Sequence, residues 1–292
     1  MTTADRPWIA VLWMFGATLS FSTMAVGGRE ATRELDTFEL MLFRSLIGVC
    51  VVVAAILVFG QRSDFSRDRL GLHGLRNVAH FTGQNLWFFA ISLAPMAQVI
   101  SLEFTSPLWV ALLAPVFLGE RVNPLRLVAI CLGFIGIVIV ADPGRLEVTP
   151  GVVAAALSAI AFALTTIVTK RLTRTTSTLN ILFWLTVMQA IFGLITAGYD
   201  GEKALPSDAV LLPVNAVSLA GLSAHFCLTL AVRIAPASFV APLDFLRLPL
   251  IAVVGLVLYG EPFEQAVLLG GAVIVVANLI NIRAEPRRQN VT

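Results

Sequence analysis

Ten long runs of apolar residues, joined by short polar links, constrain this 292-residue chain more than any other feature. A helix needs about 20 apolar residues to cross a hydrocarbon core about 30 Å thick, and the runs are close to that length. Strands of a membrane barrel would alternate at period two instead, so the runs predict helices. The runs cover approximately residues 8–27, 38–59, 72–93, 96–118, 125–141, 151–169, 179–198, 211–232, 238–259 and 264–282.

Two of the links are only Ala-Pro pairs, at 94–95 and 235–236. Merging the runs across them would give eight spans. Proline disfavours the helical conformation in the residue before it, so we favour ten. The fold class expected is therefore an all-α integral membrane protein with ten transmembrane helices.

The composition excludes most soluble classes of protein. Hydrophobic residues make up 58% of the chain and charged residues 13%, whereas soluble domains have about 45–50% and about 25%. The expected partner is the lipid bilayer. A net charge of +2 indicates no nucleic-acid partner, and the three cysteines lie inside apolar runs without metal-site spacing.

The distribution of basic residues predicts the orientation, because Lys and Arg accumulate in cytoplasmic loops. With ten spans and an inside N-terminus, thirteen basic residues lie inside and four outside. We therefore expect a multi-pass protein of a bacterial inner (plasma) membrane with both termini in the cytoplasm.

The two halves of the sequence repeat one motif, in the same order and at the same spacing. Residues 93–95 (LAP), 102–104 (LEF) and 119–120 (GE) correspond to 234–236 (IAP), 243–245 (LDF) and 260–261 (GE). Five spans per half is an odd number, so the second copy must insert upside down. Inverted repeats are typical of secondary transporters, whose substrate site lies near the midplane. We expect one transport domain with repeats at 1–145 and 146–292.

These features resemble the EamA-type members of the drug/metabolite transporter superfamily. The resemblance rests on the two five-span halves, the Ala-Pro and Gly-Glu motifs, the chain length, and the stretches 80–87 (HFTGQNLW) and 103–109 (EFTSPLW). It implies a central cavity lined by the first, third, fourth, sixth, eighth and ninth helices, with the fifth and tenth peripheral. Some relatives move amino acids, S-adenosylmethionine or riboflavin.

Charged residues inside the apolar runs are the first candidates for a substrate site, because a charge at mid-bilayer costs several kcal/mol. Glu103 is followed by Ser106 on the same helix face, and Asp244 by Arg247 at the same spacing. We expect Glu103 and Asp244 to bind a cationic or hydrogen-bond-donating group, and Arg247 to bind a carboxylate or phosphate. The alternative is a structural ion pair between Asp244 and Arg247.

A polar stripe on the third span supplies the remaining candidates. Its residues are spaced 4, 3, 4 and 3 apart, which is one face of a helix that lipid would not tolerate: His73, Asn77, His80, Gln84 and Trp87. We expect His80, Gln84, Trp87 and, from the second half, His225 to line the cavity. A flat substrate could stack on Trp87 or Trp109. The alternatives are hydrogen bonding between helices and, for tryptophan, anchoring at the interface.

Several other residues are expected to have structural roles. Arg44 and Arg76 are expected to extend toward the membrane interface, or Arg44 to pair with Glu39. Substrate binding is the less favoured alternative for Arg44. Four glycines would permit close helix packing, either in a homodimer or within one chain: Gly133, Gly136, Gly270 and Gly271.

The function expected is secondary active transport of a small polar or amphipathic metabolite by alternating access. No phosphate-binding loop, zinc motif or serine-nucleophile elbow is present, so we predict no catalytic residue, cofactor or metal. Proton coupling could use Glu103, Asp244 and the histidines. The alternatives are a membrane receptor or scaffold that does not transport, and an intramembrane enzyme.

Overall fold

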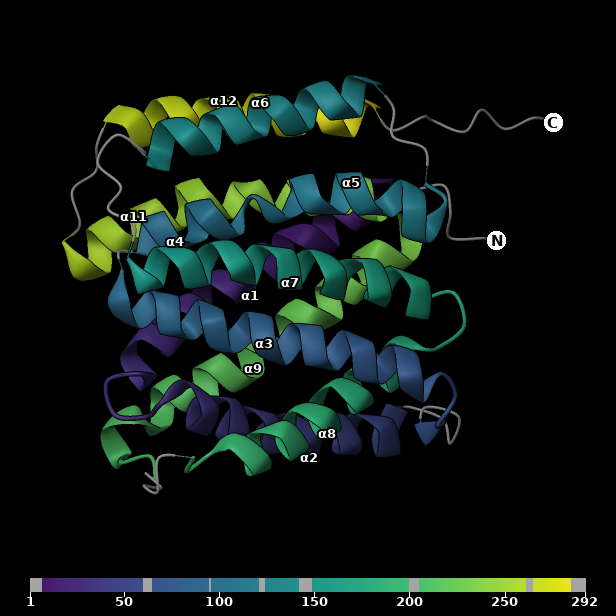
Figure 1. Cartoon of the computed structure of the whole chain (residues 1–292), viewed down its shortest axis with the longest axis vertical. Helices are drawn as coiled ribbons and strands as arrows, with labels where there is room; N and C mark the ends of the chain where they lie inside the picture. Colours follow the sequence, from purple (N-terminus) through teal and green to yellow (C-terminus); the bar gives the residue numbers. More distant parts are fainter. Residues whose placement is uncertain are drawn as a thin grey trace.

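The computed structural model describes residues 7–59, 65–94, 96–120, 124–141, 149–199, 205–260 and 265–284. Within these ranges the chain forms helices and no strands (Figure 1). The helices are α1 (Pro7–Ala31), α2 (Thr37–Phe59), α3 (Leu70–Leu93), α4 (Met96–Glu103), α5 (Ser106–Leu118), α6 (Pro124–Ala141), α7 (Pro150–Leu172), α8 (Thr178–Thr196), α9 (Asp208–Ile234), α10 (Ala237–Val240), the 3-10 helix η4 (Ala241–Leu246), α11 (Arg247–Tyr259) and α12 (Gln265–Ala284).

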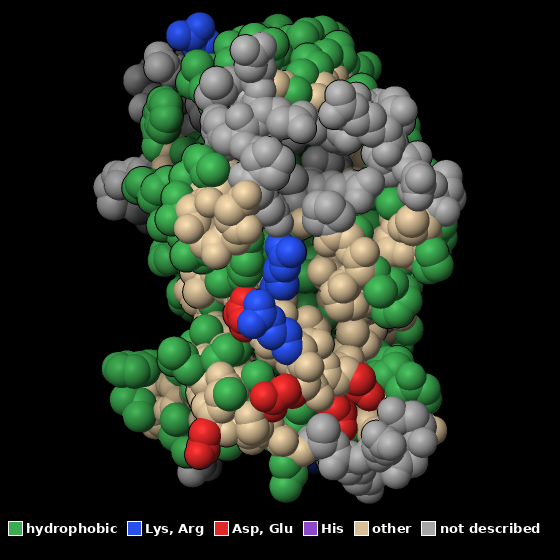
Figure 2. Space-filling model, turned by 90° about the vertical axis from the view of Figure 1, so that its left-hand side faces the viewer, with side chains coloured by type: hydrophobic (Ala, Val, Ile, Leu, Met, Phe, Trp, Pro, Cys, Tyr) green, Lys and Arg blue, Asp and Glu red, His purple; other side chains and the backbone are tan. Residues whose placement is uncertain are grey.

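The helices are those of a membrane protein. Six helical segments in the described part of the chain are long and apolar enough to cross a bilayer: α1, α2, α7, α8, α9 and the stretch Ala237–Tyr259, which comprises α10, η4 and α11. Large apolar side chains such as Leu57 and Val116 point outward, where lipid would surround them. Figure 2 views the end of the bundle at which α1 ends. Apolar side chains cover much of its described surface, and charged side chains gather near its centre.

Each predicted run is helical, but the fourth and ninth runs are broken in the middle. The fourth run divides into α4 and α5 around Phe104 and Thr105, and the ninth into α10, η4 and α11. Proline explains the first break, because the ring of Pro107 would clash with the carbonyl group four residues earlier, that of Glu103. Pro242 lies in η4, and Pro249 would act in the same way on Phe245. Glu103 and Asp244 therefore both lie where a helix is interrupted.

The packing of the helices follows the sequence repeat. The main pairs are α1 with α9, α3 with α7, α2 with α8, and α6 with α12. Aligning the two copies of the motif places α1 on α7 and α3 on α9, so it exchanges the first two pairs and preserves the other two. Figure 1 shows α6 and α12 side by side as a peripheral layer at one end of the long axis, with α2 and α8 at the opposite end. The first residues of α1 and the last residues of α12 lie on the same side of the bundle (Figure 1).

The glycines of α6 serve contacts within the chain. A Cβ atom added to Gly136 would lie 2.8 Å from the carbonyl oxygen of Gly270 on α12, and one added to Gly133 would overlap the ring of Phe245. Neither position leaves room for a larger residue. These glycines therefore let α6 approach α12 and η4 closely, which was the second of the two expectations for them.

This close approach predicts the effect of a larger side chain at Gly136. We expect Gly136→Val to lower the free energy of unfolding by about 1–3 kcal/mol, because overpacking forces α6 away from α12. The measurement is the thermal unfolding midpoint of the detergent-purified protein. Gly71→Ala on α3 is the matched control, since nothing lies within 4 Å of the added Cβ atom. An unchanged midpoint for Gly136→Val would contradict the packing of α6 on α12.

Candidate functional site

A buried cavity lies between the two halves of the chain. It is lined by α1, α3, the α4–α5 segment, α7, α9 and the α10–α11 segment, which are the six runs that the family resemblance implies. The space wide enough for water amounts to about 80 Å³. Eight of the nine residues predicted for the site lie on its walls: His80, Gln84, Trp87, Glu103, Ser106, His225, Asp244 and Arg247.

An ion triad joins the two halves across this cavity. Arg247 Nη2 donates to Glu103 Oε1 at 2.5 Å and to Asp244 Oδ2 at 2.8 Å. Trp87 Nε1 donates to Glu103 Oε2 at 2.6 Å, so both oxygens of that carboxylate accept a hydrogen bond. The guanidinium group lies between two aromatic rings, 5.1 Å from the centre of Phe21 and 5.0 Å from that of Phe104. The Asp244–Arg247 pair considered from the sequence is thus present, and Glu103 completes it.

Two histidines from different halves meet on the same cavity. The ring centres of His80 on α3 and His225 on α9 are 4.5 Å apart, and the rings are nearly perpendicular. Both side chains are buried, yet none of their four nitrogen atoms has a hydrogen-bond partner among the described residues. Phe162 packs near His80, and the edge of Phe21 packs against His225. A neutral imidazole has one donor and one acceptor, so each ring offers both to a molecule in the cavity.

Arg44 and Arg76 differ from the expectation that they extend toward the membrane interface. Both are buried. Arg44 donates to Gln84 Oε1 rather than pairing with Glu39, and Arg76 donates to Thr169 Oγ1 at 3.2 Å and to Asn77 Oδ1 at 3.0 Å. The expectation was wrong because α8 and α9 cover α2, and α7 covers α3, so these side chains point into protein. The small residues Ser45 and Gly48 beside Arg44 were the available signal for this burial.

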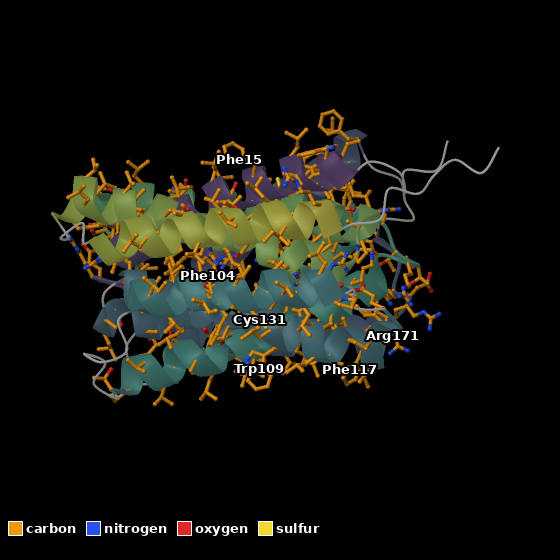
Figure 3. All side chains as sticks on the ribbon, turned by 90° about the horizontal axis from the view of Figure 1, so that it is seen from above. Phe15, Phe104, Trp109, Phe117, Cys131 and Arg171 are labelled. Carbon is orange, nitrogen blue, oxygen red and sulfur yellow. The ribbon has the colours of Figure 1, made fainter. Side chains whose placement is uncertain are left out.

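Trp109 does not line the cavity, and the prediction for it is wrong in that respect. Its side chain is 38% exposed, and Figure 3 shows it at the edge of the bundle with Phe117, whereas Phe104 lies in the interior. Sequence reasoning also missed the aromatic wall formed by Phe21, Phe104 and Phe162, since these residues look like ordinary core residues in an apolar run.

The described residues contain no group of three or more His, Cys, Asp or Glu side chains that could hold a metal ion. What the cavity offers is a polar site inside a membrane protein. It combines two carboxylates, one guanidinium and two imidazoles within aromatic walls. Such a site suits reversible binding of a small molecule by charge, hydrogen bonds and ring contacts.

Fold and cavity together define the class: a multi-pass helical membrane protein with a central polar binding site. The chain belongs to the EamA-like transporter family, whose sequence model matches residues 8–141 and again 149–283. Its relatives include a riboflavin transporter of Rhizobium johnstonii, 32% identical over 98% of this chain and 94% of the relative. An S-adenosylmethionine uptake transporter of Rickettsia bellii is 26% identical over 96% and 95%. The chain is accordingly a transporter of small metabolites.

A solved crystal structure shares the fold. It superposes with a TM-score of 0.79 at 23% sequence identity, covering 94% of this chain and 98% of the solved one.

The ion triad predicts a specific pattern of stabilities. We expect Arg247→Met to lower the free energy of unfolding by about 3–5 kcal/mol, because it leaves two buried carboxylates without a counter-ion. Adding Glu103→Gln and Asp244→Asn to this variant should restore much of the loss. Thermal unfolding in detergent measures both effects, with Arg171→Met at the exposed end of α7 as control. The triad would be energetically unimportant if Arg247→Met were as stable as the wild type.

Proposed function

We propose that the chain is a secondary transporter of a bacterial inner membrane that moves a small polar or amphipathic metabolite by alternating access. The observation that carries this proposal is the buried cavity, where helices of both halves meet and two acids lie at helix breaks. Interrupted helices expose backbone polar groups only where protein or a substrate cavity can satisfy them.

The size of the cavity supports a transport cycle rather than a permanently open pocket. Sites for drug-sized ligands usually have roughly 300–1,000 Å³, whereas this cavity offers about 80 Å³. A metabolite of the size of riboflavin could enter only if helices or side chains moved apart. In the conformation described here the cavity is thus too small for such a metabolite.

Polar contacts join the two halves at both ends of the bundle. At the end of α5, Glu120 accepts hydrogen bonds from the backbone N–H groups of Ala237 and Ser238, at 3.0 and 3.2 Å. At the other end, Tyr259 donates to Glu30 Oε1 at 3.1 Å. Opening either end requires one of these contacts to break while the other persists, which is the behaviour that alternating access needs.

The topology that we propose is two inverted five-helix repeats, residues 1–145 and 146–292, with α4–α5 and α10–α11 each counted as one crossing. The exchange of helix pairs when the two motif copies are aligned supports it. We place both termini in the cytoplasm, on the basic side of the protein. Glu103 and Asp244 are the groups through which a proton gradient would act.

The chemistry of the cavity favours a flat, polar substrate. Besides the histidine nitrogens, Asp244 Oδ1 and Arg247 Nε have no hydrogen-bond partner among the described residues. The cavity thus presents donors and acceptors on two sides, between aromatic walls. A heteroaromatic ring with donor and acceptor groups on its edges matches this arrangement, as do the substrates named for the relatives, riboflavin and S-adenosylmethionine.

The experiment is a ligand screen followed by a flux assay. The purified protein is heated with amino acids, nucleosides, S-adenosylmethionine, riboflavin and cationic drugs, and a ligand at 100 times its Kd should stabilise it by about 2.7 kcal/mol. The selected compound is then tested for uptake into proteoliposomes, with and without an imposed pH gradient. We expect Glu103→Gln and Asp244→Asn each to abolish flux while the protein still folds, because the carboxylates bind the substrate.

Asp68→Asn is the matched control, since Asp68 lies exposed before α3 and should leave flux unchanged. Normal flux in both Glu103→Gln and Asp244→Asn would show that the site is misplaced. Saturable binding to the wild type without any flux would favour the receptor alternative over transport.

A further inference from the structure

Two buried arginines lie beside the cavity without a carboxylate partner. No Asp or Glu among the described residues pairs with Arg44 or Arg76, and the groups that they contact are neutral: Gln84 and Met41 for the first, Thr169 and Asn77 for the second. Arg44 is the eighth residue of α2 and Arg76 the seventh of α3. At a rise of 1.5 Å per residue, each lies about 10 Å from the start of its helix.

Because these arginines lie deep in the bundle, their lack of a carboxylate counter-ion among the described residues is costly. Helices α2 and α3 run in opposite directions (Figure 1), so the two residues approach the middle of the bundle from opposite ends. The charges act on each other and on His80 and His225. A buried charge without a counter-ion is strongly destabilising, and two that repel each other are more so. A function that needs the positive charge would explain why both are present.

The cavity wall that carries Glu103, Asp244 and Arg247 has a net negative charge. There Arg247 is bound by both Glu103 and Asp244, so the triad has a formal charge of −1. Arg247 is thus occupied by acids, and an added anion would be repelled from it. Neither Arg44 nor Arg76 lines the cavity itself; Arg44 reaches it through Gln84. The charge distribution therefore runs from negative on the cavity wall formed by α4 and η4 to positive behind the wall formed by α3.

Side chains that line the cavity connect it to the arginines. His80 and His225 are among them, and none of their four ring nitrogens has a hydrogen-bond partner among the described residues. Gln84 also lines the cavity, and its side-chain oxygen accepts from Arg44. An anionic group that entered here could replace this oxygen as the acceptor and receive an N–H donor from the imidazoles.

We propose that Arg44 and Arg76 bind an anionic group that enters beside Gln84. The group is supplied by a carboxylate or phosphate on the transported metabolite or by a free inorganic anion such as chloride. The inference rests on the proposed transport function, and it adds that the substrate or a co-bound ion carries a negative charge. A substrate would lie with its anionic group toward α2 and α3 and its donor groups toward Glu103 and Asp244.

The experiment compares matched anionic and neutral compounds on the full chain. Thermal unfolding is measured in a HEPES buffer, whose sulfonate is bulky, with chloride or phosphate added, and with the pairs nicotinate and nicotinamide, flavin mononucleotide and riboflavin, and adenosine monophosphate and adenosine. We expect at least one anion to raise the unfolding midpoint saturably and its neutral partner not to do so. A shift by chloride or phosphate alone identifies a free anion, and a shift confined to one organic anion identifies the substrate's own group.

Variants then place the effect on the arginines. Arg44→Met and Arg76→Met should each raise the half-saturating anion concentration at least tenfold, whereas Arg44→Lys and Arg76→Lys should keep it within about threefold. Without anion, the Met variants should unfold at a higher temperature than the wild type, because an uncompensated buried charge is gone. Arg126→Met is the control: Arg126 is similarly buried, but the side chain to which it donates, Ser238, does not line the cavity, whereas Gln84, the acceptor for Arg44, does.

Two results would overturn the proposal. The first is that charged and neutral partners act alike and the Met variants leave their half-saturation unchanged. The second is that no anion shifts the midpoint and the Met variants unfold at lower temperature, which would make the arginines structural. Flux measurements separate the two proposals. If a neutral metabolite is transported and Arg44→Met leaves its flux unchanged, the anion site is refuted but the transport function stands. Absence of flux for every compound, with anion binding intact, removes the transport function alone.

Discussion

The bond between Arg247 and the two acids is the interaction on which the centre of the protein depends. Glu103 belongs to the first half of the chain, whereas Asp244 and Arg247 belong to the second. The triad joins the halves inside aromatic walls formed by Phe21 and Phe104. Because attraction is strong in such surroundings, the triad fixes how the two broken segments face each other.

The broken segments explain why the acids can occupy the centre at all. An intact helix keeps its carbonyl and N–H groups for itself and offers a cavity only side chains. Proline at 107 and 242 interrupts the regular α-helix in the middle of both segments. Glu103 is the last residue of α4, and Asp244 lies within the 3-10 helix η4, so both acids lie where the α-helical path is interrupted. The same covalent property of proline therefore sets the course of the backbone and the position of the charges.

Much of this architecture could be predicted from the sequence, because hydropathy and the internal repeat are properties of whole segments. The helical spacing of His80, Gln84 and Trp87 predicted that they share one face of α3. The repeat predicted that His225 lies on the same cavity. Arg44, Arg76 and Trp109 could not be placed in this way. Whether an arginine points to water or into protein depends on the neighbouring helix that covers it, and the exposure of Trp109 depends on how α5 packs in the bundle. Both are tertiary facts that a single segment does not encode.

The polar stripe of α3 also has a consequence for how the protein is made. A central arginine alone adds about 2.5–3.5 kcal/mol to the cost of partitioning a helix into the bilayer, and α3 adds buried histidines, an asparagine and a glutamine to it. This helix is not among the segments apolar enough to cross by composition. Its principal neighbour is α7, whose Thr169 receives the Arg76 side chain. Since α3 begins at Leu70 and α7 only at Pro150, the contact that buries Arg76 against α7 can form only after the ribosome has produced part of the second half. The order of synthesis thus separates the emergence of α3 from the burial of its arginine.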